Sequence, residues 1–136
     1  MEFALVLPIL LILLLGLIDF GMAFHGVVTV NTAAREGARQ GVVLNNDDGA
    51  TDSGTVVTAA RRVTGTLPNE INRLTIEIGG TTAFANGTTN VFSLPPSGSE
   101  MEVIVTYDYD LITPLPAFVG IDSPLTLRGV ITMMRE

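Results

Sequence analysis

The chain has 136 residues and a formal net charge of −7, with 14 acidic residues against 7 basic ones. This acidic balance argues against a nucleic-acid partner, because such a partner requires a basic surface. The chain has no cysteine and a single histidine, which excludes disulfides, thiol nucleophiles and thiolate metal sites. The length allows one modest domain in addition to an N-terminal apolar segment.

The N-terminal segment "MEFALVLPILLILLLGLIDF" carries no charge between Glu2 and Asp19. As a helix, residues 3–18 would be ~24 Å long, and an extension through residue 30 would reach ~42 Å. The hydrocarbon core of a bilayer is ~30 Å thick, so the longer helix could cross it. Asp19 would be costly inside lipid unless its carboxylate is paired or lies near the interface.

We predict one N-terminal helix over residues 1–44, with an apolar membrane or assembly half over 1–30 and an amphipathic half over 31–44. Pro8 removes a backbone donor and clashes with the preceding turn, and Gly16 is a weak helix former. These two residues predict a helix that is locally unwound or kinked between them.

The second half of this helix carries small residues at helical spacing: Ala33, Ala34, Gly37, Ala38 and Gly41. Gly37 and Gly41 form a G-x-x-x-G pair, which permits close helix packing against another backbone. The alternative interpretation is that the small residues seat the helix on the sheet of its own domain.

The charges around the apolar segment do not fit an ordinary secretory signal, which begins with basic residues. The first basic residues are Arg35 and Arg39, on the C-terminal side of the apolar run. The positive-inside rule would then leave the domain in the cytoplasm, although its Thr-, Asn- and Gly-rich composition is typical of an extracellular domain. We therefore expect that a basic leader preceded Met1 and was removed after it had set the topology.

A polar loop, "NNDDGATDSG", follows the long helix. Its carboxylates Asp47, Asp48 and Asp52 lack the spacing and the terminal Glu of an EF-hand calcium loop, so we interpret it as a solvated turn. Asp52 or Ser53 then caps a short helix, "GTVVTAARRVTG", which should end at Gly65.

The remaining sequence alternates as expected for strands. "INRLTIEIGG" and "EMEVIVTYDYDL" each place their apolar residues on one face, and "LTLRGVITMMRE" alternates again at the end of the chain. Gly79-Gly80 and Asn86-Gly87 are turn signals, and "LITPLPAFVGIDSP" is a connection. The fold class is therefore α+β, with the long helix and a short helix packed on an antiparallel sheet of three or four strands, and a globular domain over 45–136.

The two ends of the chain resemble one known family. "EFALVLPILLILLLGLIDFG" and "NTAAREGAR" resemble the TadE-like proteins of tight-adherence (Flp-type) pili, and "ITMMRE" is similar to the ending of that family. The resemblance covers residues 2–41 strongly and 125–136 moderately. It implies a pilin-like subunit that a prepilin peptidase cleaves, that enters the inner membrane, and that the pilus assembly machinery adds to a helical filament of self copies.

The resemblance also suggests where the subunits meet. We predict that the assembly interface consists of Glu2, Phe3, Leu5, Leu7, Pro8, Leu10, Leu14, Gly16, Leu17, Asp19 and Phe20. In pilins the acid is the fifth residue of the mature chain, whereas here it is the second. A buried Glu2 needs a cation, and the terminal amine of Met1, in the same or a neighbouring subunit, could supply it. The alternative is an acid at the membrane interface, exposed to headgroups.

The sequence is also compatible with other functions. The protein could be a minor pilin that primes or caps a filament, or a membrane-anchored binding module. An anchored enzyme is the weakest alternative, because His25 has no evident partner and is interpreted as a packed helix residue. Tyr107 and Tyr109 are spaced as inward-facing strand residues. We expect no catalytic residue, metal site or cofactor, and possible glycosylation at Asn86 in its N-x-[ST] sequon.

Overall fold

The computed structural model describes residues 2–43, 53–111, 120 and 124–135. A long helix, α1 (Glu2–Val43), is followed by the shorter α2 (Ser53–Thr64) and the one-turn α3 (Glu70–Arg73). The strands are β1 (Leu74–Ile78), β2 (Thr81–Ala85), β3 (Thr88–Thr89), β4 (Glu100–Tyr109) and β5 (Leu125–Met134). The α+β fold class predicted from the sequence is confirmed.

The strands form one antiparallel sheet in the order β3-β2-β1-β4-β5, so the sheet has five strands rather than three or four. The additional strand is the two-residue β3, which is too short to leave an alternation in the sequence. It is formed by the turn at Asn86-Gly87, where both residues have positive φ (49° and 77°). This is the backbone that a tight two-residue hairpin requires.

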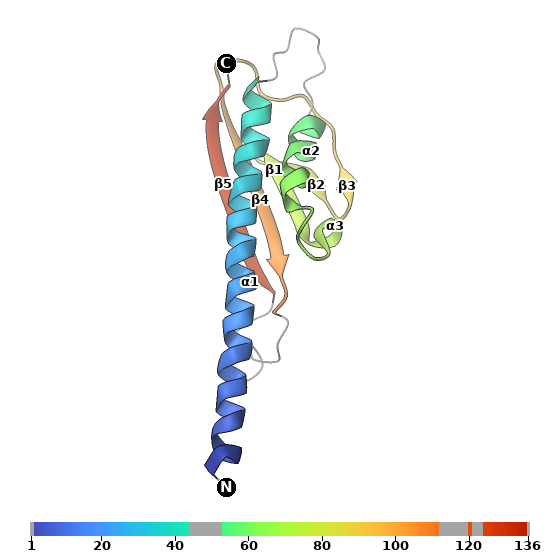
Figure 1. The fold of residues 1–136 in the computed structure, drawn as a ribbon. Coiled ribbons are helices and arrows are strands. Elements are labelled where there is room, and N and C mark those ends of the chain that lie inside the picture. The colour runs from blue at the N-terminus through green and yellow to red at the C-terminus, as the bar shows by residue number, and fades with distance from the viewer. Residues whose placement is uncertain (1, 44–52, 112–119, 121–123, 136) are drawn as a thin grey trace.

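The helices cover one face of the sheet (Figure 1). The upper half of α1 lies along β4 and β5, and α2 lies beside it, while the lower half of α1 extends beyond the domain as a rod. The core between these layers is formed by the inward residues of α1, α2, β1 and β4. Its largest fully buried apolar side chains are Leu74, Ile76, Ile78, Phe84, Met101 and Tyr107.

The predicted strand faces are confirmed in β1 and β4. Residues alternate between buried and partly exposed in β1, and in β4 all five predicted inward residues are buried: Met101, Val103, Val105, Tyr107 and Tyr109. The Tyr107 hydroxyl donates a hydrogen bond to the backbone carbonyl of Pro68 at 2.5 Å. This bond fastens the loop before α3 to the middle of the sheet.

The predicted break in α1 is wrong, because the helix runs through Pro8 and Gly16 without interruption. Pro8 lies less than two turns from the helix start, and its missing N–H removes one hydrogen bond, to the carbonyl four residues earlier. In a helix of 42 residues the remaining backbone bonds hold the geometry on both sides of that single loss.

The short helix begins and ends close to the predicted positions. The Gly65 amide donates to the Arg61 carbonyl at 3.0 Å, just after the last residue of α2. The Ser53 hydroxyl donates to the Asn90 carbonyl and accepts from the Phe92 amide, so it fastens the start of α2 to the segment after β3. Asp52, together with Asp47 and Asp48 of the preceding loop, lies outside the described residues.

Candidate assembly site

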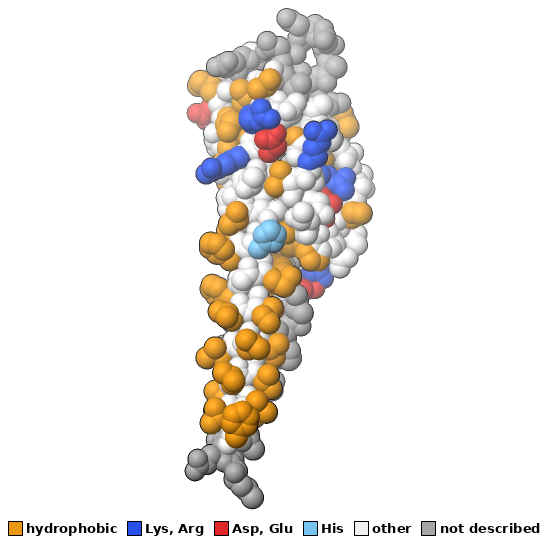
Figure 2. Space-filling model, in the orientation of Figure 1, with side chains coloured by type: hydrophobic (Ala, Val, Ile, Leu, Met, Phe, Trp, Pro, Cys, Tyr) orange, Lys and Arg blue, Asp and Glu red, His pale blue; other side chains and the backbone are white. Residues whose placement is uncertain are grey.

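The lower half of α1 exposes apolar side chains on all sides. Between residues 6 and 18 every residue is exposed except Gly16, which is partly exposed. Leu10 is 58% exposed, and Phe20, which lies nearer to the domain, is 78% exposed. Figure 2 shows these side chains as a continuous apolar surface below the domain. Isolated monomers rarely expose apolar patches of this extent, so the surface indicates a membrane or protein partner.

The predicted interface residues fall into three groups: those exposed on the rod, those outside the described residues, and the buried Asp19. Large apolar side chains are exposed along the rod: Phe3, Leu7, Leu10, Leu14, Leu17 and Phe20. Pro8 is also exposed, and Gly16 is partly exposed. Met1 and the side chains of Glu2 and Leu5 lie outside the described residues, so the pairing of Glu2 with a terminal amine stays a prediction.

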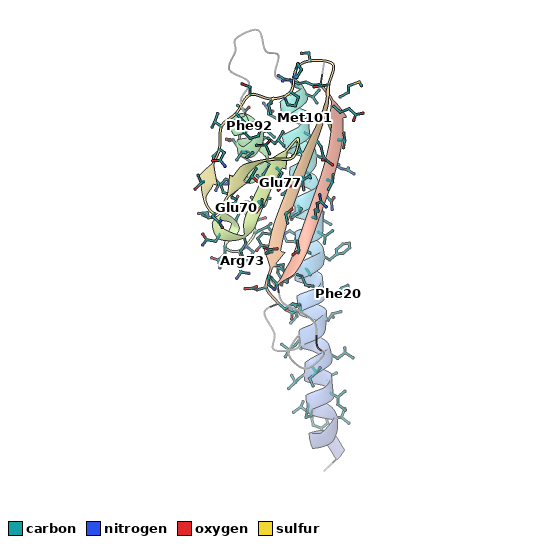
Figure 3. The ribbon with its side chains drawn as sticks, turned by 180° about the vertical axis from the view of Figure 1, so that it is seen from behind. Phe20, Glu70, Arg73, Glu77, Phe92 and Met101 are labelled. Carbon is teal, nitrogen blue, oxygen red and sulfur yellow. The ribbon has the colours of Figure 1, made fainter. Side chains whose placement is uncertain are left out.

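Asp19 forms the third group by itself, because its side chain is only 3% exposed. It lies on the side of α1 that faces the domain, whereas Phe20 points away from it (Figure 3). The pKa of the Tyr109 hydroxyl, at the end of β4, is raised by burial and additionally by the negative charge of Asp19. Asp19 therefore lies where the domain begins to cover the helix, and not on the exposed apolar surface.

A single stripe of α1 faces the domain above Asp19. Gly26, Val30, Ala33 and Gly37 follow it at spacings of three, four and seven residues, which place all of them on one side of a helix. All four are buried. The part of this stripe below Ala33 was not predicted, although its helical spacing is visible in the sequence.

The small residues of the stripe let α1 approach its own domain closely. A Cβ added at Gly37 would touch Ala60 and Val56 of α2 at 3.4 Å, and one added at Gly41 would collide with the end of Met101. The close helix packing at Gly37 and Gly41 is therefore made inside the chain, on α2 and β4. The structure contains one copy of the chain and leaves untested whether a second backbone approaches there.

The closest approach of α1 to the backbone of the sheet is at Gly129 of β5, a residue that was not predicted from the sequence. A Cβ there would lie 2.9 Å from the carbonyl oxygen of Val30 and 3.0 Å from the Cα of Asn31. A glycine inside a strand often marks such a close backbone approach. This contact holds the middle of α1 against the sheet.

The comparisons with known proteins concern the long helix. Residues 1–39 match the family model described as TadE-like protein. The chain has a TadE-like N-terminal segment. Comparison with curated proteins and with solved structures gave no significant match. The TadE-like match includes the whole exposed rod and most of the buried stripe, and it ends before the last turn of α1.

The TadE-like helix is also long and apolar enough to cross a membrane. A candidate span lies within Val6–Val43, and only 6% of its most apolar window is buried inside the chain. The exposed lower half therefore fits insertion into a bilayer. The matched helix alone does not distinguish a helix that stays in the membrane from one that leaves it for a filament.

Residues with possible chemistry lie outside this TadE-like surface. His25 is exposed on α1 rather than packed, and Asn86 is exposed in its turn. Within the described parts of the chain, no group of three or more His, Asp or Glu residues could hold a metal ion. A non-enzymatic role and glycosylation at Asn86 both stay predictions.

Proposed function

We propose that this TadE-like protein is a structural pilin-like subunit, which resides in the membrane through α1 and then assembles with copies of itself into an extracellular filament. In this proposal a prepilin-type peptidase processes the chain and the pilus assembly machinery extracts it. The observation that carries the proposal is the rod of α1, which is apolar on all sides below Asp19, while the same helix is fastened to a folded domain above that residue.

The division of α1 supports a role in assembly. A simple anchor needs only an apolar span, and a flexible linker can join it to the domain. Here the rod is instead a rigid continuation of a helix that forms part of the domain core. Rigid continuity transmits the position of the rod to the domain, which a regular filament requires and an anchor does not.

The direct test is to place a charge in the rod. Leu10→Asp and Leu14→Asp should each abolish filaments, because a carboxylate between packed rods would be buried without a partner. In the membrane one Asp costs about 2.5–3.5 kcal/mol, which so apolar a helix tolerates, so both variants should still fractionate with the membrane.

The matched control is Val91→Asp. Val91 lies on the domain and is 61% exposed, close to the 58% of Leu10, so the two substitutions differ in location and not in initial exposure. Filaments should persist in this control. Normal filament yield from both rod variants, with the protein present in the membrane, would refute the proposal.

A second candidate is a minor pilin that primes or caps a filament made mainly of another protein. The TadE-like match favours it as much as the major subunit, because the matched segment is the helix and not the domain. Mass spectrometry of purified surface filaments distinguishes the two. This chain should dominate if it is the major subunit and should be rare, and located at an end, if it is a minor pilin.

A further inference from the structure

Two opposite faces of the domain carry opposite charges that the rod does not explain. The first, the basic helix face, consists of Arg35 and Arg39 on α1 and Arg62 on α2, all of them exposed. Figure 2 shows arginine side chains gathered over the upper part of these two helices. This face points away from the sheet, because the inward stripe of α1 occupies the opposite side of the helix.

The charges of the basic helix face are poorly satisfied within the chain. Among the described residues, no carboxylate lies within 4.0 Å of Arg35 or Arg62. Arg39 bonds Glu36 at 2.7 Å, but its side chain is 61% exposed. Ion pairs as exposed as this one contribute little stability. All three guanidinium groups therefore remain available to an external partner.

The second face, the acidic sheet face, carries Glu77 on β1 and Glu100 and Glu102 on β4, and these three carboxylates outnumber the one exposed cation on the same side of the sheet, Arg128, which is paired with Thr106. These residues point away from the helices, because their neighbours Ile78, Met101 and Val103 are buried in the core. Glu77 lies on this side of the sheet (Figure 3). No described cation lies within ion-pairing distance of the three carboxylates.

The two faces lie at the same height along the axis of α1. Gly41 abuts Met101, and Val30 abuts Gly129, which is paired with Val105 in the sheet. The stretch of β4 between Met101 and Val105 therefore runs beside the stretch of α1 between residues 41 and 30. On the sheet, this interval contains Glu102 and also Glu77, which is paired with Ile104. On the helix, it contains Arg35 and Arg39.

We propose that the basic helix face of one copy docks on the acidic sheet face of the next copy. This inference rests on the proposed function, because apolar rods packed side by side and pointing the same way would bring these faces to equal heights. The contact is head-to-tail and joins opposite sides of the subunit, so it leaves a free face at each end and can repeat without closing. The occupant is a second copy of this chain.

Charge complementarity also answers a difficulty of self-assembly for this sequence. Copies with a net charge of −7 repel each other at long range. An excess of basic residues on one face and of acidic residues on the opposite face makes one relative orientation attractive while others stay repulsive. Contacts of this kind determine register and partner choice more than total affinity.

The first test uses mixed variants with reversed charges, in the full-length protein reconstituted in lipid. Arg35→Glu and Glu102→Arg should each lower self-assembly by about tenfold or more, because like charges then meet across the contact. A mixture of the two variants should restore assembly, because the acidified helix face of one meets the basified sheet face of the other. Higher salt should weaken both the wild-type contact and the rescue.

The control has the same change in net charge as Arg35→Glu but lies elsewhere. Thr88→Glu combined with Thr89→Glu alters two exposed residues of β3, at the far edge of the sheet, and should assemble like wild type. Failure of the mixture to rescue, or an equal loss in the control, would overturn the inference.

The second test locates the contact, and the absence of native cysteine makes it specific. Thr32→Cys lies two turns before Arg39 on the helix face, and Thr132→Cys is paired with Glu102 on the sheet face. A short bismaleimide should join these two variants in a mixture, and neither variant to itself. If the two variants assemble without forming this cross-link, and Leu10→Asp still abolishes assembly, the docking of the two faces is refuted and the proposed function stands. No self-assembly under any condition would refute both.

Discussion

Replacing Gly129 with alanine tests whether α1 is held on the sheet by direct backbone contact. The added methyl group would lie 2.9 Å from the Val30 carbonyl oxygen and 3.0 Å from the Asn31 Cα. Optimal separations between nonbonded carbon atoms are about 3.5–4.0 Å, so the helix and strand would have to separate by roughly 0.5 Å. Both contacted atoms belong to the helix backbone, which cannot turn aside as a flexible side chain can.

The expected cost follows from these contacts. Overpacking of a core costs about 1–3 kcal/mol, and the lower chain entropy of alanine in the unfolded state offsets about 0.4–1 kcal/mol of it. The net loss should be about 1–2 kcal/mol. For a domain of this size such a loss lowers Tm by roughly 4–16 °C.

Tyrosine near-UV circular dichroism provides the assay, because the only two tyrosines, Tyr107 and Tyr109, are both buried on β4. Thermal unfolding of the full chain in detergent then reports on the domain and not on the rod. Gly37→Ala is the control, since its methyl group would meet side-chain atoms at 3.4 Å in a helix interior. It should be neutral or stabilising by up to about 1 kcal/mol. Equal responses of the two glycines, or an unchanged Tm in Gly129→Ala, would refute the close-contact argument.

Four further substitutions test individual interactions. Tyr107→Phe should lower the free energy of unfolding by about 1 kcal/mol in chemical denaturation, because the variant loses the hydrogen bond to the backbone carbonyl of Pro68. Tyr109→Phe should leave the free energy of unfolding unchanged, because the buried Tyr109 hydroxyl has no hydrogen-bond partner among the described residues. The Arg73 guanidinium lowers the pKa of Asp110 from 3.8 through a hydrogen bond, so its contribution to stability should be present above that pH and lost as the pH falls below it. Asp110→Asn should show a smaller loss of Tm on acidification, and an unchanged acid profile would contradict this. Glu2→Gln should leave Tm unaltered but reduce the incorporation of the variant into wild-type filaments, because breaking a buried ion pair from one side costs roughly 3–5 kcal/mol. Equal incorporation of variant and wild type would exclude the predicted pairing.

The regular elements were predictable because their residues repeat with the period of the structure. Alternation in β4 places the five inward residues of that strand correctly, and the Gly79-Gly80 and Asn86-Gly87 turns give the two hairpins. These signals are local and need no information about the partner surface. The strand count failed only at β3, where two residues are too few to show a period.

The position of Asp19 could not be derived from its immediate sequence. An acid in an apolar run is compatible with a lipid interface, a neighbouring subunit or the chain's own domain, and these environments differ only in which side of the helix is covered. The covered side becomes visible when Asp19 is aligned with Gly26, Val30 and Ala33, one stripe in which each residue is buried. The prediction of a break at Pro8 was wrong for a related reason. It rested on the low helix propensity of single residues and not on the hydrogen bonds of the long helix around them.

The environment of the rod before assembly places a constraint on what can drive assembly. Lipid covers apolar side chains as well as a neighbouring rod does, so the hydrophobic effect by itself does not favour transfer of α1 from the membrane to a filament. Packing between the rods supplies attraction but little discrimination, because Leu and Ile side chains around the whole circumference offer many nearly equivalent contacts. Register and direction must therefore come from polar groups at defined heights. We propose that in this chain those groups are Glu2 at the start of the rod and the charged faces of the domain, which are joined by one continuous helix.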